Sequence, residues 1–412
     1  MDENINPGSR WMVLVTMFIV TATTSTFLIA PAPLIGAILR ATPGLSAGQV
    51  VLMTMTSFNI FAAVSAILGG ILIDKFGVMK FYIGGSIIIG AGALLTPFIG
   101  SSSWGIIFIR GLQGIGTGPI MVAILPIAAR YFPVKLRSLI IVLQGLAVAS
   151  GVALGLIVMP GIFQATQSWQ TAMAWLAPIS IPGLISSIFV ALGQKQPEEE
   201  KADIKTSFRQ DIITALSNPV TWVVIACLAL HAWFYQAFND LIPNYLNAAP
   251  PVGSGYDQNI AGMLMSIASW ITICGGFAGV LIAERFLRGN ARPVVLSGFI
   301  SGAICILLIS APAMAANHMI MGICVCGIGF FSAFIGPQAL GHIAKYYPEQ
   351  ITGTIGGLTG ISIFAGIAGP TVNAAAVQNS GGFQMPLVIM AGVAVMGALA
   401  AFFLKPVKAV QQ

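Results

Sequence analysis

The chain has 412 residues, of which 57% are hydrophobic and 7% are charged, and its mean hydropathy is +0.92. Soluble domains contain about 25% charged residues, so this composition excludes a soluble enzyme. A transmembrane helix needs about 20 apolar residues, which leaves room for about a dozen spans and for no large soluble domain. The net charge of +6 indicates no nucleic-acid partner, since basic residues at helix ends are attracted to anionic lipid headgroups.

Uncharged runs mark the expected helices, because a charged side chain facing lipid costs several kcal/mol. The first half contains six such runs: Trp11–Leu39, Val50–Ile73, two between Lys80 and Arg130, and two between Ser138 and Gln194. The second half contains six more: Val220–Leu246, Ile260–Ala283, two between Pro293 and Ala344, and two between Gln350 and Leu404. The sequence therefore predicts an all-α membrane protein with twelve transmembrane helices. We expect two six-helix bundles, residues 1–192 and 219–412, joined by a charged cytoplasmic linker, residues 193–218.

The distribution of Lys and Arg predicts the orientation. If both termini are cytoplasmic, every Lys and Arg except Arg40 and Arg110 lies on the cytoplasmic side, as the positive-inside rule requires. Residues Met1–Arg10 lack the cleavage pattern of a signal peptide, so the first span is expected to stay in the mature protein. We expect a multi-pass protein of the cytoplasmic (inner) membrane.

No pattern typical of catalysis or metal binding is present. The five cysteines all fall in apolar runs, which favours buried free thiols. The glycines of Gly114–Gly118 lie inside an apolar run and lack the strand and lysine of a nucleotide site. We therefore expect a protein that is not an enzyme and that has no cofactor and no metal.

Two segments of the first half recur in the second. Gly69–Gly77 matches Gly279–Phe286, with acid, base and Phe in the same order, and Arg130–Pro133 matches Lys345–Pro348, with a base, two aromatic residues and a proline. The matching segments lie about 210 residues apart. Parallel repeats of this kind are common in transporters.

These segments carry a resemblance to a known family. Gly70–Lys80 resembles the motif between the second and third helices of the major facilitator superfamily, and Arg110–Gly116 is similar to the motif of its fourth helix. With the layout of six plus six helices, the resemblance covers essentially the whole chain. It implies a secondary transporter in which two bundles rock around a central cavity, and it does not give the substrate.

The resemblance also implies a gating role for charges at the cytoplasmic helix ends. Asp74 would hold the two bundles together in one state and release them in the other, with Arg130, Lys135 or Arg137 as its basic partner. The alternative is ordinary membrane-surface charge. The predicted gating residues are Asp74, Lys75, Arg130, Arg137, Glu284 and Arg285.

Arg110 is the one cation inside a predicted span, and an ionisable group there is a functional-site hypothesis by default. The resemblance suggests substrate binding or proton coupling. The alternative is a structural arginine that binds backbone carbonyls. Gln113, one turn further on, lies on the same face and could share either role.

The seventh span contains an unusual number of polar side chains. His231, Tyr235 and Asn239 are spaced by four and lie on one helix face, with Gln236 and Asp240 next to it. His231 and Asp240 are the proton-coupling candidates, although Asp240 could instead mark an extracellular helix end. The other three are candidates for substrate contact.

Three further residues complete the predicted substrate site. Thr24 belongs to a run of hydroxyls, many of which bond their own helix backbone. Gln144 and Trp270 lie near the middle of their spans, where an aromatic more often packs than binds. The predicted substrate-binding residues are Arg110, Gln113, Thr24, Gln144, Tyr235, Gln236, Asn239 and Trp270.

The positive charge at Arg110 favours a monomeric transporter of a small, monocarboxylate-like organic anion, coupled to protons or exchanging a counter-anion. A dianionic substrate is disfavoured. Transporters of dicarboxylates and nitrate usually carry basic residues on the spans equivalent to the second, eighth or eleventh, and this chain has none there. The alternative is a proton-coupled exporter of drugs or amphiphilic compounds, because the Gly-rich fifth span ending at Pro160 weakly resembles the antiporter motif. A non-transporting membrane sensor is a third reading, disfavoured by the lack of a soluble signalling domain.

Overall fold

The computed structural model describes residues 7–193, 212–311 and 317–405. Within these ranges the regular structure is helical, and twelve helices are long and apolar enough to cross a membrane. The predicted all-α fold with twelve spans is therefore confirmed. Most of the predicted linker, residues 194–211, lies outside the described residues.

The chain divides into two compact units. The first comprises Met1–Ser217 with Tyr347–Ile361, and the second comprises Asn218–Tyr346 with Ser362–Gln412. The short segment Tyr347–Ile361 thus belongs to the first unit, although the sequence-based division places it with the second half.

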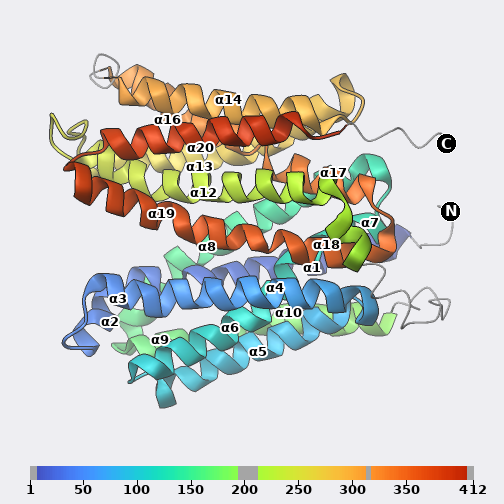
Figure 1. Cartoon of the computed structure of the whole chain (residues 1–412). Helices are drawn as coiled ribbons and strands as arrows, with labels where there is room; N and C mark the ends of the chain where they lie inside the picture. Colours follow the sequence, from blue (N-terminus) through green and yellow to red (C-terminus); the bar gives the residue numbers. More distant parts are fainter. Residues whose placement is uncertain (1–6, 194–211, 312–316, 406–412) are drawn as a thin grey trace. The chain divides into compact units, whose positions relative to one another are not determined.

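The first unit contains six spans, several of them built from consecutive helices (Figure 1). They are α1 (Pro7–Ile29) with η1 (Ala32–Leu34) and α2 (Ile35–Ala41); α3 (Ala47–Val51) with the π-helix η2 (Leu52–Thr56) and α4 (Ser57–Phe76); α5 (Val78–Ile99); α6 (Ser103–Val122) with α7 (Ile124–Tyr131); η3 (Val134–Leu136) with α8 (Arg137–Thr166); and α9 (Trp169–Ala174) with α10 (Ala177–Gly193). The later segment adds η5 (Glu349–Ile351) and α18 (Thr352–Thr359).

Small residues set the helix packing in the first unit. α4 packs most extensively on α6, and α1 packs on α8. A Cβ at Gly118 of α6 would overlap the Ala62 carbonyl of α4, and a Cβ at Gly151 of α8 would overlap the Ala22 backbone of α1. Glycine at these positions lets the backbones approach closely, as is common between transmembrane helices.

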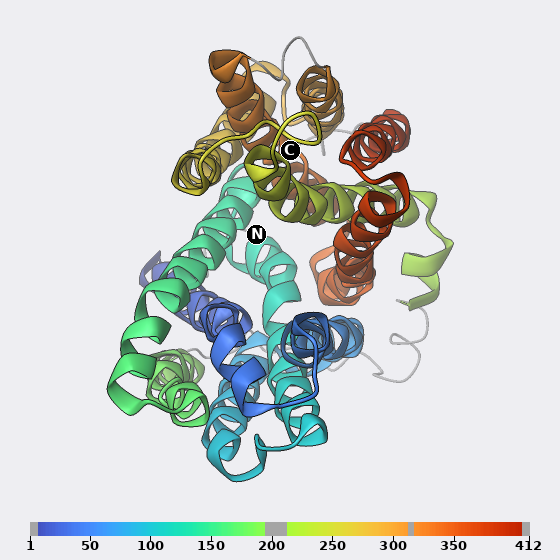
Figure 2. The same cartoon turned by 90° about the vertical axis from the view of Figure 1, so that its left-hand side faces the viewer.

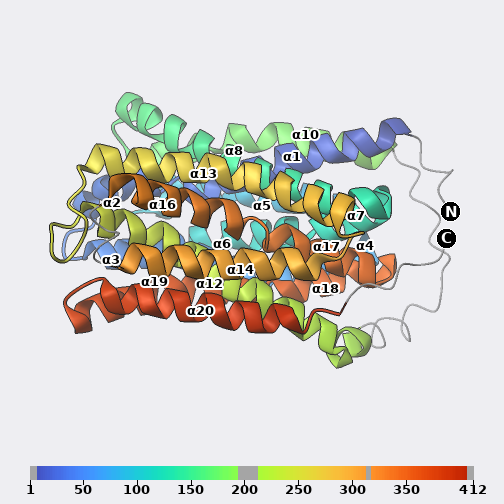
Figure 3. The same cartoon turned by 90° about the horizontal axis from the view of Figure 1, so that it is seen from above.

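The second unit is built in the same manner. Its helices are α12 (Pro219–Asn247), α13 (Gln258–Leu281) with the π-helix η4 (Ile282–Phe286), α14 (Ala291–Ser310), α16 (His318–Ser332) with α17 (Gly336–Tyr346), α19 (Ile361–Ser380) and α20 (Gln384–Phe402). α14 packs along α20, and α13 packs along α16. Figure 2 shows most helices nearly end on, and Figure 3 shows α14 and α20 side by side.

The internal repeat is visible as two equivalent ion pairs. Asp74 at the end of α4 binds Arg130 of α7, with 3.0 Å between the carboxylate oxygen and the guanidinium nitrogen. In the second unit, Glu284 of η4 binds Lys345 of α17. In each unit an acid ending the second span thus binds a base ending the fourth.

Candidate functional site

Arg110 of α6 is buried, with 2% of its surface exposed, and binds the backbones of two neighbouring helices. Its Nε donates to the Thr54 carbonyl at 2.5 Å. Its two terminal nitrogens donate to the carbonyls of Phe27 at 2.8 Å and Leu28 at 3.1 Å. The guanidinium thus joins α6 to the end of α1 and to η2.

The sequence and the local helix geometry explain why two of these carbonyls are available. Pro31 lies four residues after Phe27 and has no N–H, so the Phe27 carbonyl cannot make its usual helical hydrogen bond. α1 ends at Ile29 for the same reason. Thr54 lies in η2, where the regular α-helical hydrogen-bond pattern is interrupted. Arg110 supplies donors where the local backbone does not.

Two side chains complete the surroundings of the guanidinium. Gln113 accepts from Arg110 at 2.7 Å through its Oε1, and its buried Nε2 has no partner in the described part of the chain. The Phe58 ring lies 4.4 Å from the guanidinium carbon, in a cation–π arrangement. Four of the five N–H groups of Arg110 are therefore used within the first unit.

No carboxylate neutralises this cation: among the described residues, none lies within ion-pair distance of Arg110. The guanidinium also borders a small pocket lined in part by Thr54, Thr96 and Trp169. The hydrogen bonds match the structural alternative given for Arg110. The adjoining pocket has a volume of about 10 Å³, which holds no more than one water molecule, so the feature that favours an anion is the unneutralised charge.

Thr24 and Gln144 have local partners in the first unit. The buried Thr24 hydroxyl donates to the Thr21 carbonyl of its own helix at 2.9 Å. Gln144 of α8 donates through Nε2 to the Met121 carbonyl of α6, also at 2.9 Å. The structure brings neither side chain into hydrogen-bond contact with Arg110.

The polar face predicted in the seventh span lies on α12. The rings of His231 and Tyr235 stack with centroids 5.9 Å apart, and the Asn239 amide donates to the Tyr235 carbonyl at 2.8 Å. His231 hydrogen-bonds the Ser332 backbone, and its buried Nε2 has no partner among the described residues. This imidazole therefore has a free nitrogen in the interior of the second unit.

Gln236 and Asp240 lie exposed on the same helix. No hydrogen bond or ion pair of the Asp240 carboxylate occurs within the described ranges. α12 continues for seven residues beyond Asp240, about 10 Å, so this acid is not at a helix end. Trp270 of α13 is 71% exposed and therefore does not join the α12 residues inside the second unit.

Asn373 of α19 was not predicted. It is fully buried, and neither atom of its amide has a partner in the described part of the chain. Its neighbours place it beside α12, because Gly369, one turn earlier, lies against the Trp233 carbonyl, and Gly366 lies against Gln236. Buried polar groups are nearly always paired, so this amide is a further candidate for polar contact beside α12.

Two other unpartnered groups lie on α17. The Nε2 atoms of Gln338 and His342 are buried, and neither has a hydrogen-bond partner among the described residues. Their spacing of four places both on one helix face. Neither residue was predicted, although their spacing is the same as that of His231 and Tyr235 on α12.

Asp74 makes the densest set of contacts among the predicted gating residues. Besides Arg130, its carboxylate accepts from the backbone N–H groups of Gly353 at 2.9 Å and Thr354 at 2.5 Å. The Thr354 hydroxyl donates to it as well, at 2.9 Å. A carboxylate at the first turn of α18 is favoured by the helix dipole. One turn before Asp74, Gly70 packs so closely against Gly357 of α18 that a Cβ at Gly70 would overlap the Gly357 backbone.

The other predicted gating residues differ in their surroundings. Arg137 donates to the Glu349 carboxylate at 3.0 Å and to the Ala129 carbonyl at 2.8 Å, so it forms a second contact with the segment Tyr347–Ile361. Lys75 is exposed, with its ammonium 5.3 Å from the Phe76 ring, and Arg285 is also exposed. Neither Lys75 nor Arg285 joins the contacts around Asp74.

Residues 12–368 match the sequence model of a protein family, the Major Facilitator Superfamily. This chain belongs to the Major Facilitator Superfamily and is an integral, multi-pass membrane transporter, not an enzyme. It is 24% identical over 400 residues to a probable sulfoacetate transporter of Cupriavidus necator, a match that covers 90% of this chain and 88% of that protein.

Two further similarities agree with this family. The chain is 25% identical over 383 residues to a hexuronate transporter of Bacillus subtilis, covering 88% of this chain and 87% of that one. Its fold is similar to that of the fucose:proton symporter of E. coli, with a TM-score of 0.73, 15% identity, and coverage of 96% and 98%.

Proposed function

We propose that this protein is a secondary active transporter that moves a small, monocarboxylate-like organic anion across the cytoplasmic membrane by alternating access. The observation that carries the proposal is Arg110, a buried cation with no carboxylate partner within the described residues. Among the relatives, a transporter named for hexuronate, a monocarboxylate, supports it. Sulfoacetate, for which another relative is named, carries both a carboxylate and a sulfonate, so that name supports an anionic substrate but not a single charge.

Arg110 acts on the substrate mainly through its charge. Four of its N–H groups hold backbone and Gln113, which leaves one donor for an anion. Electrostatic attraction is stronger in an interior of low dielectric constant than in water. The positive charge therefore favours an anionic substrate, and the hydrogen bonds keep the guanidinium in a fixed position.

The second unit supplies polar contacts and the proton-coupling groups. We assign substrate contact to Tyr235, Gln236 and Asn239 of α12, and we add Asn373, whose amide has no partner among the described residues. His231 has a free ring nitrogen that can accept a proton, and the Asp240 carboxylate is not engaged by a described cation. Coupling to protons runs through these two residues, unless a counter-anion is exchanged instead.

The contacts of Asp74 act as a releasable gate. The segment Tyr347–Ile361 packs with the first unit, yet the chain continues from it into α19, whose residues from Ser362 onward belong to the second unit. Hydrogen bonds from Gly353 and Thr354 to Asp74 hold this segment in one state. They are broken in the other state. Both termini are cytoplasmic in this account, and the transporter works as a monomer.

Ligand-induced stabilisation tests the proposed substrate class. Purified protein in detergent is heated with small carboxylates, sulfonates, zwitterions and lipophilic cations at two pH values. A ligand that binds only the folded state adds about 2.7 kcal/mol of stability at a concentration of 100 Kd. We expect carboxylates and sulfonates to raise the unfolding temperature. Stabilisation by lipophilic cations alone would contradict the proposal and favour a drug exporter with Asp240 at its site.

A further inference from the structure

An apolar groove runs between α14 and α20 on the surface of the second unit. Its volume is about 410 Å³, within the range of roughly 300–1,000 Å³ that is typical of small-molecule sites. Its lining includes the small residues Ala303 and Ala398 and the exposed side chains of Ile300, Leu307 and Leu399. Since the lining residues are all apolar, the groove fits a hydrocarbon chain.

The length of the groove matches one leaflet of a membrane. On α14 the lining residues extend from Leu296 to Leu307, eleven residues, or about 16 Å along the helix. The hydrocarbon core of a bilayer is about 30 Å thick, so one leaflet is about 15 Å. A single acyl chain therefore fits along the groove from one surface of the membrane to its middle.

A cation stands at one end of the groove. Arg292, one turn before Leu296, holds its guanidinium carbon 4.3 Å from the centre of the Phe402 ring, and Phe402 is itself a lining residue. Among the described residues no carboxylate forms an ion pair with Arg292. Its N–H groups are therefore available to a phosphate, which a guanidinium binds in a bidentate manner.

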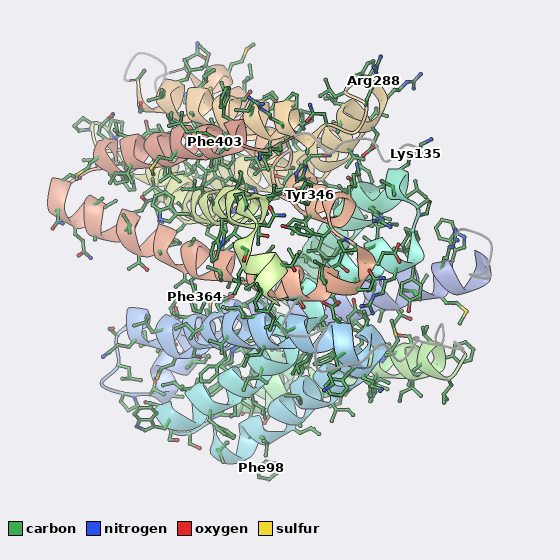
Figure 4. All side chains as sticks on the ribbon, turned by 45° about the vertical axis from the view of Figure 1, so that its right-hand side comes forward. Phe98, Lys135, Arg288, Tyr346, Phe364 and Phe403 are labelled. Carbon is green, nitrogen blue, oxygen red and sulfur yellow. The ribbon has the colours of Figure 1, made fainter. Side chains whose placement is uncertain are left out.

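Other charges at this end strengthen the preference for an anion. Arg285, Arg288 and Lys405 are exposed there, and Figure 4 shows Arg288 pointing away from the helices. The one acid nearby in the described part of the second unit, Glu284, is bound by Lys345. This end of the groove therefore carries a net positive charge. It attracts anionic lipid headgroups more strongly than zwitterionic ones.

We propose that this groove is a binding site for an anionic glycerophospholipid. One acyl chain lies between α14 and α20, and the phosphate is bound by Arg292. A second copy of the chain is a poorer occupant, because a symmetric dimer places the same patch of both copies against itself. The cationic ends would then face each other. In the predicted orientation this end faces the cytoplasm, where anionic lipids are common.

The test uses delipidated full-length protein titrated with dioleoyl phosphatidylglycerol, dioleoyl phosphatidylethanolamine or soluble glycerol phosphate. The unfolding temperature and the number of bound lipids by native mass spectrometry are measured. We expect about tenfold tighter binding of phosphatidylglycerol than of phosphatidylethanolamine, which corresponds to about 1.4 kcal/mol. Glycerol phosphate, which has no acyl chain, is expected to bind weakly. Equal effects of glycerol phosphate and phosphatidylglycerol would overturn the acyl-chain part of the site.

Two pairs of variants locate the site. Arg292→Gln is expected to remove the preference for phosphatidylglycerol, whereas Arg40→Gln, an exposed arginine of the first unit, changes the net charge equally and keeps it. Ala398→Phe fills the groove and is expected to weaken both lipids, whereas Met396→Phe, at an exposed position outside the groove, is expected to weaken neither.

Two results would overturn the proposal. One is a preference for phosphatidylglycerol that persists in Arg292→Gln together with unchanged binding in Ala398→Phe. The other is a dimer of the unmodified protein that Ala398→Phe dissociates, which would assign the groove to a second copy. If Arg292→Gln fails to fold, Arg292→Lys keeps the charge but loses bidentate geometry, and a weakened preference is then expected.

Discussion

Arg110→Met is expected to abolish organic-anion transport and to lower the unfolding temperature of the protein. The substitution removes the buried positive charge, and it leaves the carbonyls of Phe27, Leu28 and Thr54 without their donor. Each buried group left unpaired costs about 1–3 kcal/mol, so the loss of stability is several kcal/mol. Uptake into proteoliposomes and thermal unfolding in detergent measure the two effects separately.

Two further variants separate the charge from the hydrogen bonds. Arg110→Lys keeps the charge with fewer donors, so it is expected to be less stable than the unmodified protein but to retain binding of the anion. Ser65→Ala removes a buried hydrogen bond from α4 to the Gly114 carbonyl of α6, which loosens α6 against the span that also contains η2, without changing charge. It is expected to leave transport nearly unchanged. Anion binding at full strength in folded Arg110→Met would contradict a role for this charge in binding.

Asp74→Asn is expected to slow turnover about tenfold or more with little change in substrate affinity. The carboxylate accepts hydrogen bonds from Arg130, Gly353 and Thr354, and an amide keeps one acceptor oxygen and no charge. Hydrogen bonds to charged groups contribute about 1.5–3 kcal/mol, so their loss destabilises the state that they hold. The step that returns the transporter to that state then becomes slower, and about 1.4 kcal/mol is tenfold in rate. Transport rate and substrate Kd are measured on the same preparation.

Glu284→Gln is the matched control for this experiment. Glu284 occupies the equivalent position in the repeat, yet it binds Lys345 inside the second unit. Its substitution is therefore expected to slow turnover much less than Asp74→Asn. A fall in affinity with unchanged turnover in Asp74→Asn would contradict the gating role. Equal effects of the two variants would show that the contacts with Gly353 and Thr354 are unimportant.

The sequence was sufficient to predict the spans, because lipid excludes charge and the uncharged runs therefore mark the helices. It did not predict the π-helix η2, which interrupts the second span, because that depends on tertiary contacts. It also did not predict that Tyr347–Ile361 packs with the first unit. That arrangement depends on Asp74, about 280 residues away, and such a distance carries no local signal.

The candidate site was predicted in part for similar reasons. Arg130 was among the expected partners of Asp74, since the family resemblance fixed which helix ends meet. The carbonyl partners of Arg110 follow from Pro31 on another helix and could not be read from α6 alone. Trp270 was chosen because it lies near the middle of its span. That position does not say which face of α13 carries the side chain, and the side chain is exposed. Asn373 lies in a Gly- and Ala-rich span with other polar residues near it, such as Thr371 and Gln378, and only its burial sets it apart.

Counterflow in proteoliposomes tests the central claim most directly. Vesicles containing the purified protein are loaded with an unlabelled carboxylate or sulfonate, and entry of the labelled compound is followed with and without a pH gradient. We expect saturable entry of a small organic anion that is absent with Arg110→Met and retained with Ser65→Ala. Entry of lipophilic cations, with no entry of any organic anion that stabilises the protein, would contradict it.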